Sequence, residues 1–258
     1  MFEQFLKPAS IDEAVKFKSQ FKDNAVFMAG GSKLNAAPTR STKSVAISLA
    51  GLGLNTIKSE GGQVTIGATT TLQQVIDNPV VPAAVREAAG FVYSRNIRNQ
   101  ATFGGELFAQ QNEAVLLPVL LVLNARVALA GGSVVDLADW LTGSRDALVL
   151  AVMLPEPDVC CATRKVARSA GGLTVLTAAV AIAADGLQRI AIEGVAPCAS
   201  RLRAVEQKNL TGEALQSAIS EAIAPITDLR GSVSYKRYIA GVVIADLVND
   251  CQQMIKEK

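Results

Sequence analysis

The chain contains the stretch Ile97-Arg-Asn-Gln-Ala-Thr-Phe-Gly-Gly-Glu-Leu107, which says more about its fold than any other. Gly104-Gly105 has no Cβ atoms, so another backbone or a ligand can approach it closely. Thr102 adds a hydroxyl group, and Arg98-Asn99 supplies polar groups able to fix a loop or contact a ligand. We expect the stretch to lie in a long polar loop over residues 94–106.

A second glycine pair lies in Ala29-Gly-Gly-Ser-Lys-Leu34, at the end of an apolar strand predicted over 25–29. Its glycines allow a sharp turn with free amides, and Ser32 adds a hydroxyl, which together suit a phosphate or pyrophosphate. An isolated Gly-Gly is more often an ordinary tight turn. Neither loop has the G-x-G-x-x-G or the G-x-x-x-x-G-K-[ST] nucleotide-binding pattern. The residues alone predict two backbone nests, which could converge on one anionic ligand.

Helix and strand signals alternate around these loops. Capping boxes at 10–13 and 71–74 predict helix starts, and Pro82 suits the first turn of a third helix. Asp185-Gly186 predicts a β-hairpin with a type I′ turn. Further strands are predicted at 44–49, 63–68, 126–130, 148–153, 178–184 and 187–193, and further helices at 213–224 and 232–256. Pro155-Glu-Pro157 is the predicted domain boundary.

Composition narrows the possible functions. The chain has 258 residues, enough for one large domain or two modest ones. Its net charge of +2, with no basic face, makes nucleic acid an unexpected partner. The absence of histidine excludes Ser-His-Asp hydrolysis, His-ligated zinc and His acid–base chemistry. A cofactor is therefore expected to carry any catalysis.

The cysteines and the apolar stretches indicate a protein without a metal site or a membrane span. Cys160, Cys161, Cys198 and Cys251 form no C-x-x-C pair, so we expect buried structural thiols and no metal site. No secretory signal is visible at the N-terminus. The longest apolar stretch, 114–130, is interrupted by a proline, an asparagine and an arginine, so we expect buried core rather than a membrane span. The cytoplasm is the expected compartment.

Three motifs in order resemble those of the FAD-binding subunits of molybdenum hydroxylases, the middle chain or domain of xanthine dehydrogenase-like and carbon monoxide dehydrogenase-like enzymes. The family's A-G-G-[TS]-x-L corresponds to 29–34, and its I-R-N-x-A-T-x-G-G-x-L to 97–107. Its D-x-R-G-S-x-x-Y-R-R is similar to Asp228-Leu-Arg-Gly-Ser-Val-Ser-Tyr-Lys-Arg237. The resemblance spans essentially the whole chain.

The resemblance implies an α+β fold with an FAD-binding domain at 1–155, made of subdomains at about 1–55 and 56–155. A small C-terminal α+β domain would follow at 156–258, and FAD would lie between the two subdomains. The implied partners are a molybdenum-cofactor subunit and an iron–sulfur subunit. Electrons would pass from them through this FAD to NAD, oxygen or another acceptor, with no catalytic side chain in this chain.

The resemblance also implies the site residues. The pyrophosphate would be held by Ala29, Gly30, Gly31, Ser32, Lys33 and Leu34. Thr102, Gly104, Gly105 and Glu106 would line a second wall, and Lys165 falls where the family often has a lysine near the flavin ring. The motif residues Arg230, Tyr235 and Arg237 are expected to be structural, locking the last helix onto its domain.

Three departures from the family pattern bear on the cofactor. Lys33 stands where aspartate is usual, and Glu106 stands where asparagine is usual, which replaces an amide with an acceptor-only carboxylate. The segment 109–115 lacks the usual proline-containing turn and aspartate. One alternative is therefore a flavin-free paralogue that acts as a structural or docking subunit. Another is a stand-alone flavoenzyme, for which Glu106 and Lys165 are the candidate acid–base residues.

Overall fold

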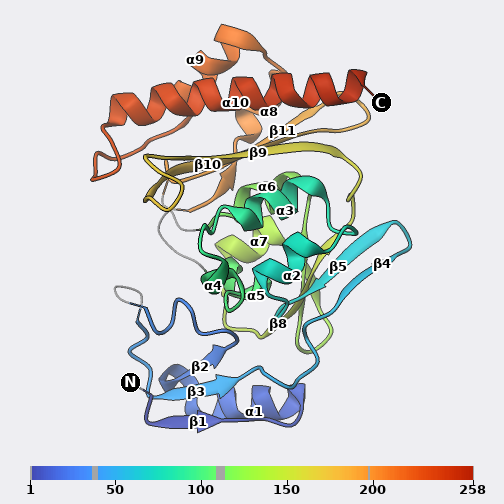
Figure 1. Cartoon of the computed structure of the whole chain (residues 1–258), viewed down its shortest axis with the longest axis vertical. Helices are drawn as coiled ribbons and strands as arrows, with labels where there is room; N and C mark the ends of the chain where they lie inside the picture. The colour runs from blue at the N-terminus through green and yellow to red at the C-terminus, as the bar shows by residue number, and fades with distance from the viewer. Residues whose placement is uncertain (1, 37–39, 109–113, 197, 258) are drawn as a thin grey trace.

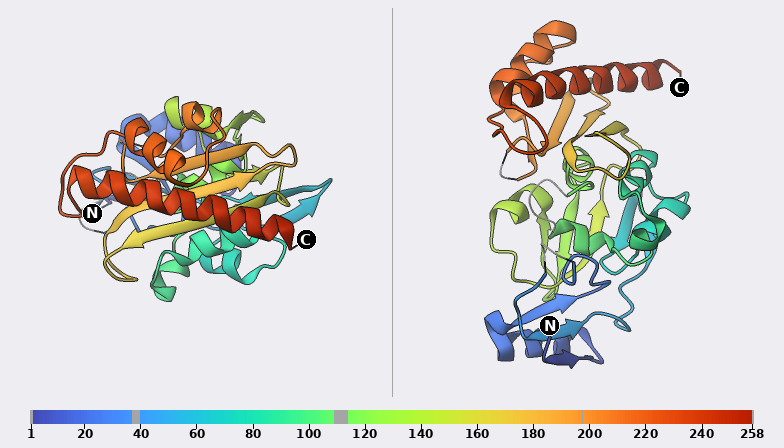
Figure 2. Two further views of the ribbon diagram at one scale, coloured as in Figure 1. Left: turned by 90° about the horizontal axis from the view of Figure 1, so that it is seen from above. Right: turned by 60° about the vertical axis from the view of Figure 1, so that its left-hand side comes forward.

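In the part of the chain that the structure describes, three β-sheets follow one another along the long axis of the molecule (Figure 1). The computed structural model describes residues 2–36, 40–108, 114–196 and 198–257. A small N-terminal sheet lies at one end, a five-stranded sheet lies in the middle, and a four-stranded sheet lies under the long C-terminal helix at the other end. Figure 2 shows the same order from a second side. The predicted α+β fold class is confirmed.

The N-terminal sheet is parallel, with strand order β1-β3-β2. Its elements are β1 (Gln4–Leu6), α1 (Ile11–Phe21), the short 3₁₀ helix η1 (Lys22–Asn24), β2 (Ala25–Met28) and β3 (Val45–Ser48). Ser10 caps α1 as predicted, because its Oγ accepts from the backbone N–H of Glu13 at 3.2 Å. The Glu13 carboxylate accepts from the N–H of Ala9 at 2.6 Å, one residue earlier than a standard capping box requires.

The middle sheet has strand order β4-β5-β8-β6-β7, and its neighbouring strands are antiparallel. Its strands are β4 (Ile57–Glu60), β5 (Gln63–Gly67), β6 (Arg126–Leu129), β7 (Val134–Asp136) and β8 (Val149–Leu154). Its helices are α2 (Leu72–Asp77), α3 (Ala83–Gly90), α4 (Arg95–Arg98), α5 (Phe103–Leu107), α6 (Leu117–Val122) and α7 (Leu137–Thr142). The predicted capping box at Thr71 and Gln74 is complete, with both reciprocal hydrogen bonds present. Helix α6 is buried throughout.

The predicted polar loop over 94–106 is wrong, since most of it forms the short helices α4 and α5. Serine and threonine side chains start both helices: Ser94 caps α4, and Thr102 caps α5. Helices of four and five residues are too short to persist alone, so contacts with the rest of the fold must stabilise them. The polar composition that favoured a loop instead supplies those caps.

The C-terminal sheet has strand order β12-β11-β10-β9. Its elements are β9 (Cys160–Ala167), β10 (Thr174–Ile182), β11 (Gln188–Glu193), β12 (Ser200–Arg201), α8 (Arg203–Glu206), α9 (Gly212–Ala222) and α10 (Val233–Lys256). Successive residues of β10 point alternately to opposite faces of the sheet, and each face packs against a different hydrophobic core. Ala179 and Ala181 join the core that contains α6, whereas Ala178 and Val180 join the core under α10. The sheet therefore packs against α6 on one face and against α10 on the other (Figure 1).

The hairpin between β10 and β11 is confirmed, but its turn is not type I′. That type needs a positive φ at both central residues. Gly186 has φ 81°, whereas Asp185 is not among the residues with positive φ. The N–H of Gly186 donates to the carbonyl of Ala183 at 2.9 Å, so the turn spans 183–186, and left-handed Gly186 is its last residue.

The four cysteines are free thiols. Cys198 is exposed, which corrects the expectation that every thiol is buried, whereas Cys251 is buried. Burial raises the pKa of Cys251 to about 12 and that of Cys161 well above its ordinary value. In the described residues there is no group of three His, Cys, Asp or Glu side chains that could hold a metal. None of the described helices is long and apolar enough to span a membrane.

Candidate flavin site

The first glycine loop follows β2 and turns back on itself. Gly31 has φ 71°, a left-handed conformation that favours glycine, and its carbonyl accepts from the N–H of Asn35 at 3.1 Å. Within the described part of the chain, no hydrogen bond reaches the backbone N–H groups of Gly30, Gly31 and Ser32. Three successive free amides on a turned backbone are what an anion nest requires. Anion binding at this loop stays a prediction.

The second glycine loop is built differently, because its amides are used inside the protein. The N–H of Phe103 donates to Thr70 at 2.8 Å, and that of Gly104 donates to Ala68 at 2.9 Å. The N–H of Gly105 donates to the Thr102 hydroxyl at 3.2 Å. The prediction of a second backbone nest is therefore wrong, since these amides are spent on capping α5 and fastening it beside β5.

The two loops nevertheless meet. A Cβ added to Gly30 would overlap the carbonyl oxygen of Gln100, so only glycine allows this contact. Lys33 Nζ lies 3.5 Å from Glu106 Oε1, which gives a second connection. The Glu106 side chain is 2% exposed and that of Lys33 is 32% exposed. The two single-residue departures from the family pattern thus lie in contact with each other, across the two glycine loops.

Arg98, at the C-terminal end of α4, is held by three hydrogen bonds. Its Nε donates to Gln73 Oε1 at 2.9 Å, and its Nη1 donates to the carbonyls of Val92 and Tyr93 at 2.9 and 2.8 Å. Of the two roles left open for this residue, fixing a loop is the one that the structure shows. Arg98 anchors the segment before Thr102 to α2.

Lys165 lies on β9 and contacts backbone carbonyls rather than either glycine pair. Its Nζ donates to Phe91 at 3.1 Å and to Ala170 at 3.3 Å. Burial lowers its pKa from the ordinary value. The ammonium thereby ties the C-terminal sheet to the segment just after α3, a few residues before α4. Its assignment to the flavin ring stays a prediction.

The third motif forms a braced turn at the start of α10. Asp228 Oδ1 lies 2.8 Å from Nζ of Lys236, whose side chain is 1% exposed. The same carboxylate accepts hydrogen bonds from the backbone N–H of Arg230 at 2.8 Å and from its Nη1 at 3.2 Å. The Lys236 hydrogen bond, with those from Arg230, lowers the pKa of Asp228 to about 2. The expected structural role of this motif fits these contacts, although Lys236, not Tyr235 or Arg237, supplies the buried cation.

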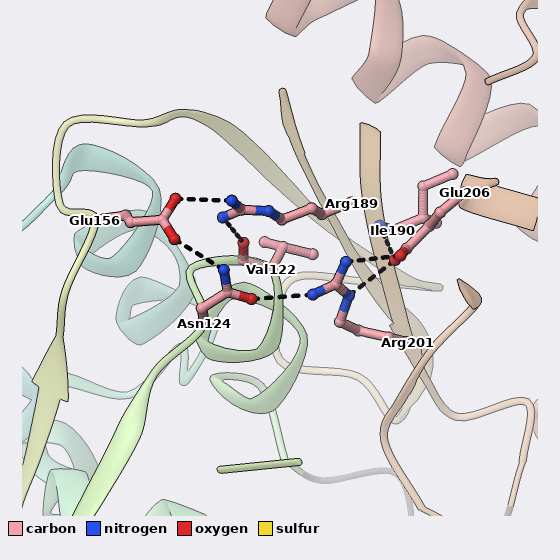
Figure 3. A network of polar contacts seen from close by, with 7 residues as sticks. All are labelled: Val122, Asn124, Glu156, Arg189, Ile190, Arg201 and Glu206. Carbon is pink, nitrogen blue, oxygen red and sulfur yellow. Dashed lines mark hydrogen bonds and ion pairs between the residues drawn. The ribbon is translucent and has the colours of Figure 1, made fainter. Parts of the chain in front are cut away.

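Sequence reasoning missed a polar network that joins the middle and C-terminal parts (Figure 3). Asn124 donates to Glu156 at 2.9 Å and accepts from Arg201 at 3.0 Å. Glu156 also pairs with Arg189 at 2.8 Å, and Arg201 pairs with Glu206 at 2.6 Å. Burial by itself raises the pKa of Glu156, but hydrogen bonds from Asn124 and Arg189 outweigh it and leave that pKa lowered. Asn124 has a positive φ of 51°, but this backbone conformation cannot be read from the sequence, so the network had no sequence signal.

Most of the segment 109–115, the third departure from the family pattern, lies outside the described residues, which resume at Ala114. The remaining site residues can be placed. Ala29 and Leu34 flank the amide nest and are half-buried. Gly104 is buried against Ala68, whereas Gly105 is exposed. The structure thus brings 29–34 into contact with 97–107, whereas Lys165 contacts the carbonyls of Phe91 and Ala170 instead.

Comparison with known proteins agrees with this architecture. Residues 1–157 match the family described as FAD binding domain in molybdopterin dehydrogenase. The chain is 51% identical over 257 residues to the uncharacterized protein YgfM of Escherichia coli (strain K12), covering 100% of this chain and 99% of that one. It is 29% identical over 279 residues to the carbon monoxide dehydrogenase medium chain of Hydrogenophaga pseudoflava, covering 95% and 96% of the two chains.

A solved structure of carbon monoxide dehydrogenase from Hydrogenophaga pseudoflava gives the same result in three dimensions. The TM-score is 0.88 at 26% identity, with 98% of each chain covered. The family match and the fold together define an FAD-binding subunit of the oxidoreductase class. The chain belongs to the family of FAD-binding domains of molybdopterin dehydrogenases, whose cofactor is FAD.

Proposed function

We propose that this chain is the electron-relay subunit of a multi-subunit molybdenum-hydroxylase-type oxidoreductase. It takes electrons from a partner iron–sulfur subunit, which receives them from a molybdenum-cofactor subunit, and passes them through FAD to NAD or another acceptor. The supporting observation is the free amide nest at Gly30, Gly31 and Ser32, held against the 97–107 loop at Gln100. The similarity to a dehydrogenase medium chain over nearly its whole length supports the partners.

The residues fit FAD at its most demanding group, the pyrophosphate. Two phosphate charges need converging donors, which the nest amides and the Ser32 hydroxyl supply. Ala29 and Leu34 border this nest. Bound FAD supplies a centre that exchanges electrons with an iron–sulfur cluster or hydride with a nicotinamide. The side chains of this chain need only bind and orient it, which agrees with the absence of histidine.

The second wall of the proposed site comes from the 97–107 loop. Exposed Gly105 is its ligand-facing residue, and buried Thr102 lines this wall from behind, where its hydroxyl caps α5 and holds Gly105 in place. Gly104 contributes by packing, since it lies against Ala68, and Glu106 contributes through Lys33. Lys165 stays proposed for the flavin-ring side, where its bond to Phe91 holds it near the segment that leads to α4.

The first experiment is the absorbance spectrum of the gently purified chain, repeated after FAD is added and the excess is removed. Oxidised-flavin bands that stay with the protein and bleach with dithionite support electron relay. Anaerobic addition of NADH then tests the acceptor: bleaching supports NAD, and an unchanged spectrum removes it. A colourless chain that does not retain added FAD overturns the proposal.

One observation favours the flavin-free docking alternative. Lys33 and Glu106 contact each other directly across the two loops, so the loops have a connection that needs no cofactor. The Gly30→Ala variant separates the two readings, because its Cβ must push the loops apart at Gln100. A docking subunit would keep its partner binding in this variant, whereas a relay subunit would lose FAD.

A further inference from the structure

The Lys33–Glu106 contact joins the two halves of the proposed FAD site through a buried carboxylate. Lys33 directly follows Ser32, the last residue of the free amide nest, and Glu106 lies in α5. Their charged atoms are 3.5 Å apart. Since the Glu106 side chain is 2% exposed, its charge is largely removed from water and requires compensation within the protein.

The two partners are unequally free to move. Helix α5 is fixed by the hydrogen bonds from Phe103 to Thr70 and from Gly104 to Ala68, so Glu106 has a set position. Lys33 belongs to a loop and its side chain is about one-third exposed, so it is less constrained than Glu106. The pair therefore pulls the loop towards α5, not the reverse.

We propose that Lys33 and Glu106 are positioning residues that form a latch, holding the 29–34 loop against α5 so that the nest amides face the FAD pyrophosphate. This inference rests on the proposed function. The competing role for Lys33 is that of a direct phosphate ligand with Glu106 as a bystander. The two roles predict opposite signs for one substitution.

That substitution is Glu106→Gln, which removes the negative charge and nearly preserves the shape. If Lys33 only bound phosphate, losing a nearby carboxylate would tighten FAD binding, because both groups are anionic. If the pair is a latch, the loop loses this attachment to α5, and the dissociation constant for FAD rises about 10-fold or more. The readout is flavin fluorescence quenching during titration of the apo chain, with visible circular dichroism of the bound flavin reporting its orientation.

The latch is tested from its other side with Lys33→Met, which we expect to weaken FAD binding to a similar extent. The double variant K33M/E106Q should bind FAD no more weakly than the weaker single variant, because the contact can be broken only once. Lys33→Arg keeps the cation and should stay within about threefold of wild type. The matched control is Arg126→Met, which breaks the exposed Arg126–Asp136 pair and should leave FAD affinity unchanged.

Each outcome decides something. A wild-type chain that fails to bind FAD overturns the proposed function, and this inference with it. A wild-type chain that binds FAD, while Glu106→Gln binds it equally or more tightly, overturns the latch alone. Additive losses in the double variant also overturn it. If Glu106→Gln does not fold, as judged by far-ultraviolet circular dichroism, Glu106→Asn takes its place, since asparagine is the residue usual in the family and is also uncharged. The latch predicts weaker FAD binding for it, whereas the direct-ligand role predicts tighter binding.

Discussion

Gly30-Gly31 and Gly104-Gly105 look alike in sequence, yet the protein uses them in different ways. In the first pair the chain turns through a left-handed conformation at Gly31, and the described residues leave both amides free. In the second pair both amides are occupied, by Ala68 and by Thr102. One pair therefore offers its backbone to a ligand, whereas the other fastens a helix to the fold. A glycine pair in a sequence indicates close approach but does not say what approaches.

The contact between the loops depends on the first pair. Gly30 lies so close to the Gln100 carbonyl that no side chain fits, and the Lys33–Glu106 pair spans the same two loops. Changes in the first pair should therefore appear in flavin affinity, and changes in the second pair should appear in the free energy of unfolding. Measuring both quantities for each variant tests this division.

The largest effect is expected for Gly30→Ala. Its Cβ would overlap the backbone carbonyl of Gln100, so the two loops must move apart. We expect the dissociation constant for FAD to rise at least about 100-fold, or about 2.7 kcal/mol, while the fold persists. Flavin fluorescence titration measures the affinity, and far-ultraviolet circular dichroism checks the fold. Gly90→Ala is the control, since nothing lies within 4 Å of a Cβ there. Wild-type affinity in Gly30→Ala would contradict the loop contact.

Gly104→Ala should instead act on stability. A Cβ at this buried position would lie 2.7 Å from Ala68 Cβ and 2.8 Å from the Ala68 carbonyl oxygen, which is overpacking against backbone. We expect the free energy of unfolding to fall by about 2–3 kcal/mol. Urea denaturation of the apo chain measures it. The molecules that stay folded should lose less FAD affinity than Gly30→Ala does; the reverse order would break the distinction between the two pairs.

Asp228→Asn tests a motif that carries the family resemblance but lies outside both loops. The pKa of Asp228 is lowered to about 2 from the usual 3.8, so its stabilising effect is present above pH 4 and is lost as the pH falls from about 4 towards 2. We expect the substitution to cost about 1–2 kcal/mol at pH 7, since it also leaves buried Lys236 without its carboxylate. Thermal unfolding across this pH range checks it.

For Asp228→Asn the difference from wild type should shrink as the pH approaches 2, because the wild-type carboxylate then becomes neutral as well. FAD affinity at pH 7 should not change. A clear loss of affinity would assign the third motif to the cofactor site rather than to the fold.

Sequence patterns predicted the parts of this fold that depend on neighbours in the chain. Ser10 and Thr71 cap helices as predicted, and each signal lies within one helical turn. The β10–β11 hairpin was predicted from a turn dipeptide, although its turn type was wrong. The family motifs identified the two loops that meet at the candidate site. What was predictable is therefore local chemistry together with motif order.

What could not be predicted depends on contacts between distant positions. Helices α4 and α5 are too short to have a periodic signal, and Arg98 reaching Gln73 helps hold α4 in place. Nothing local tells that Lys33 meets Glu106, or that the Gly104 amide is already taken by Ala68. A composition typical of loops cannot distinguish free amides from occupied ones. That distinction separates the two glycine pairs.

The smallest and sharpest test compares the hydroxyl groups of the two loops. Thr102 Oγ1 accepts from the N–H of Gly105 and caps α5, whereas the Ser32 hydroxyl has no hydrogen bond to any described residue. Thr102→Val should therefore cost about 1 kcal/mol of unfolding free energy and change FAD affinity less than about twofold. Ser32→Ala should leave stability within about 0.5 kcal/mol, because a solvated hydroxyl is lost. Its FAD affinity should fall about threefold to fivefold, since one neutral hydrogen bond is worth about 1 kcal/mol. Equal profiles for the two variants would mean that both hydroxyl groups serve the same purpose, and the division between a ligand loop and a packing loop would fail.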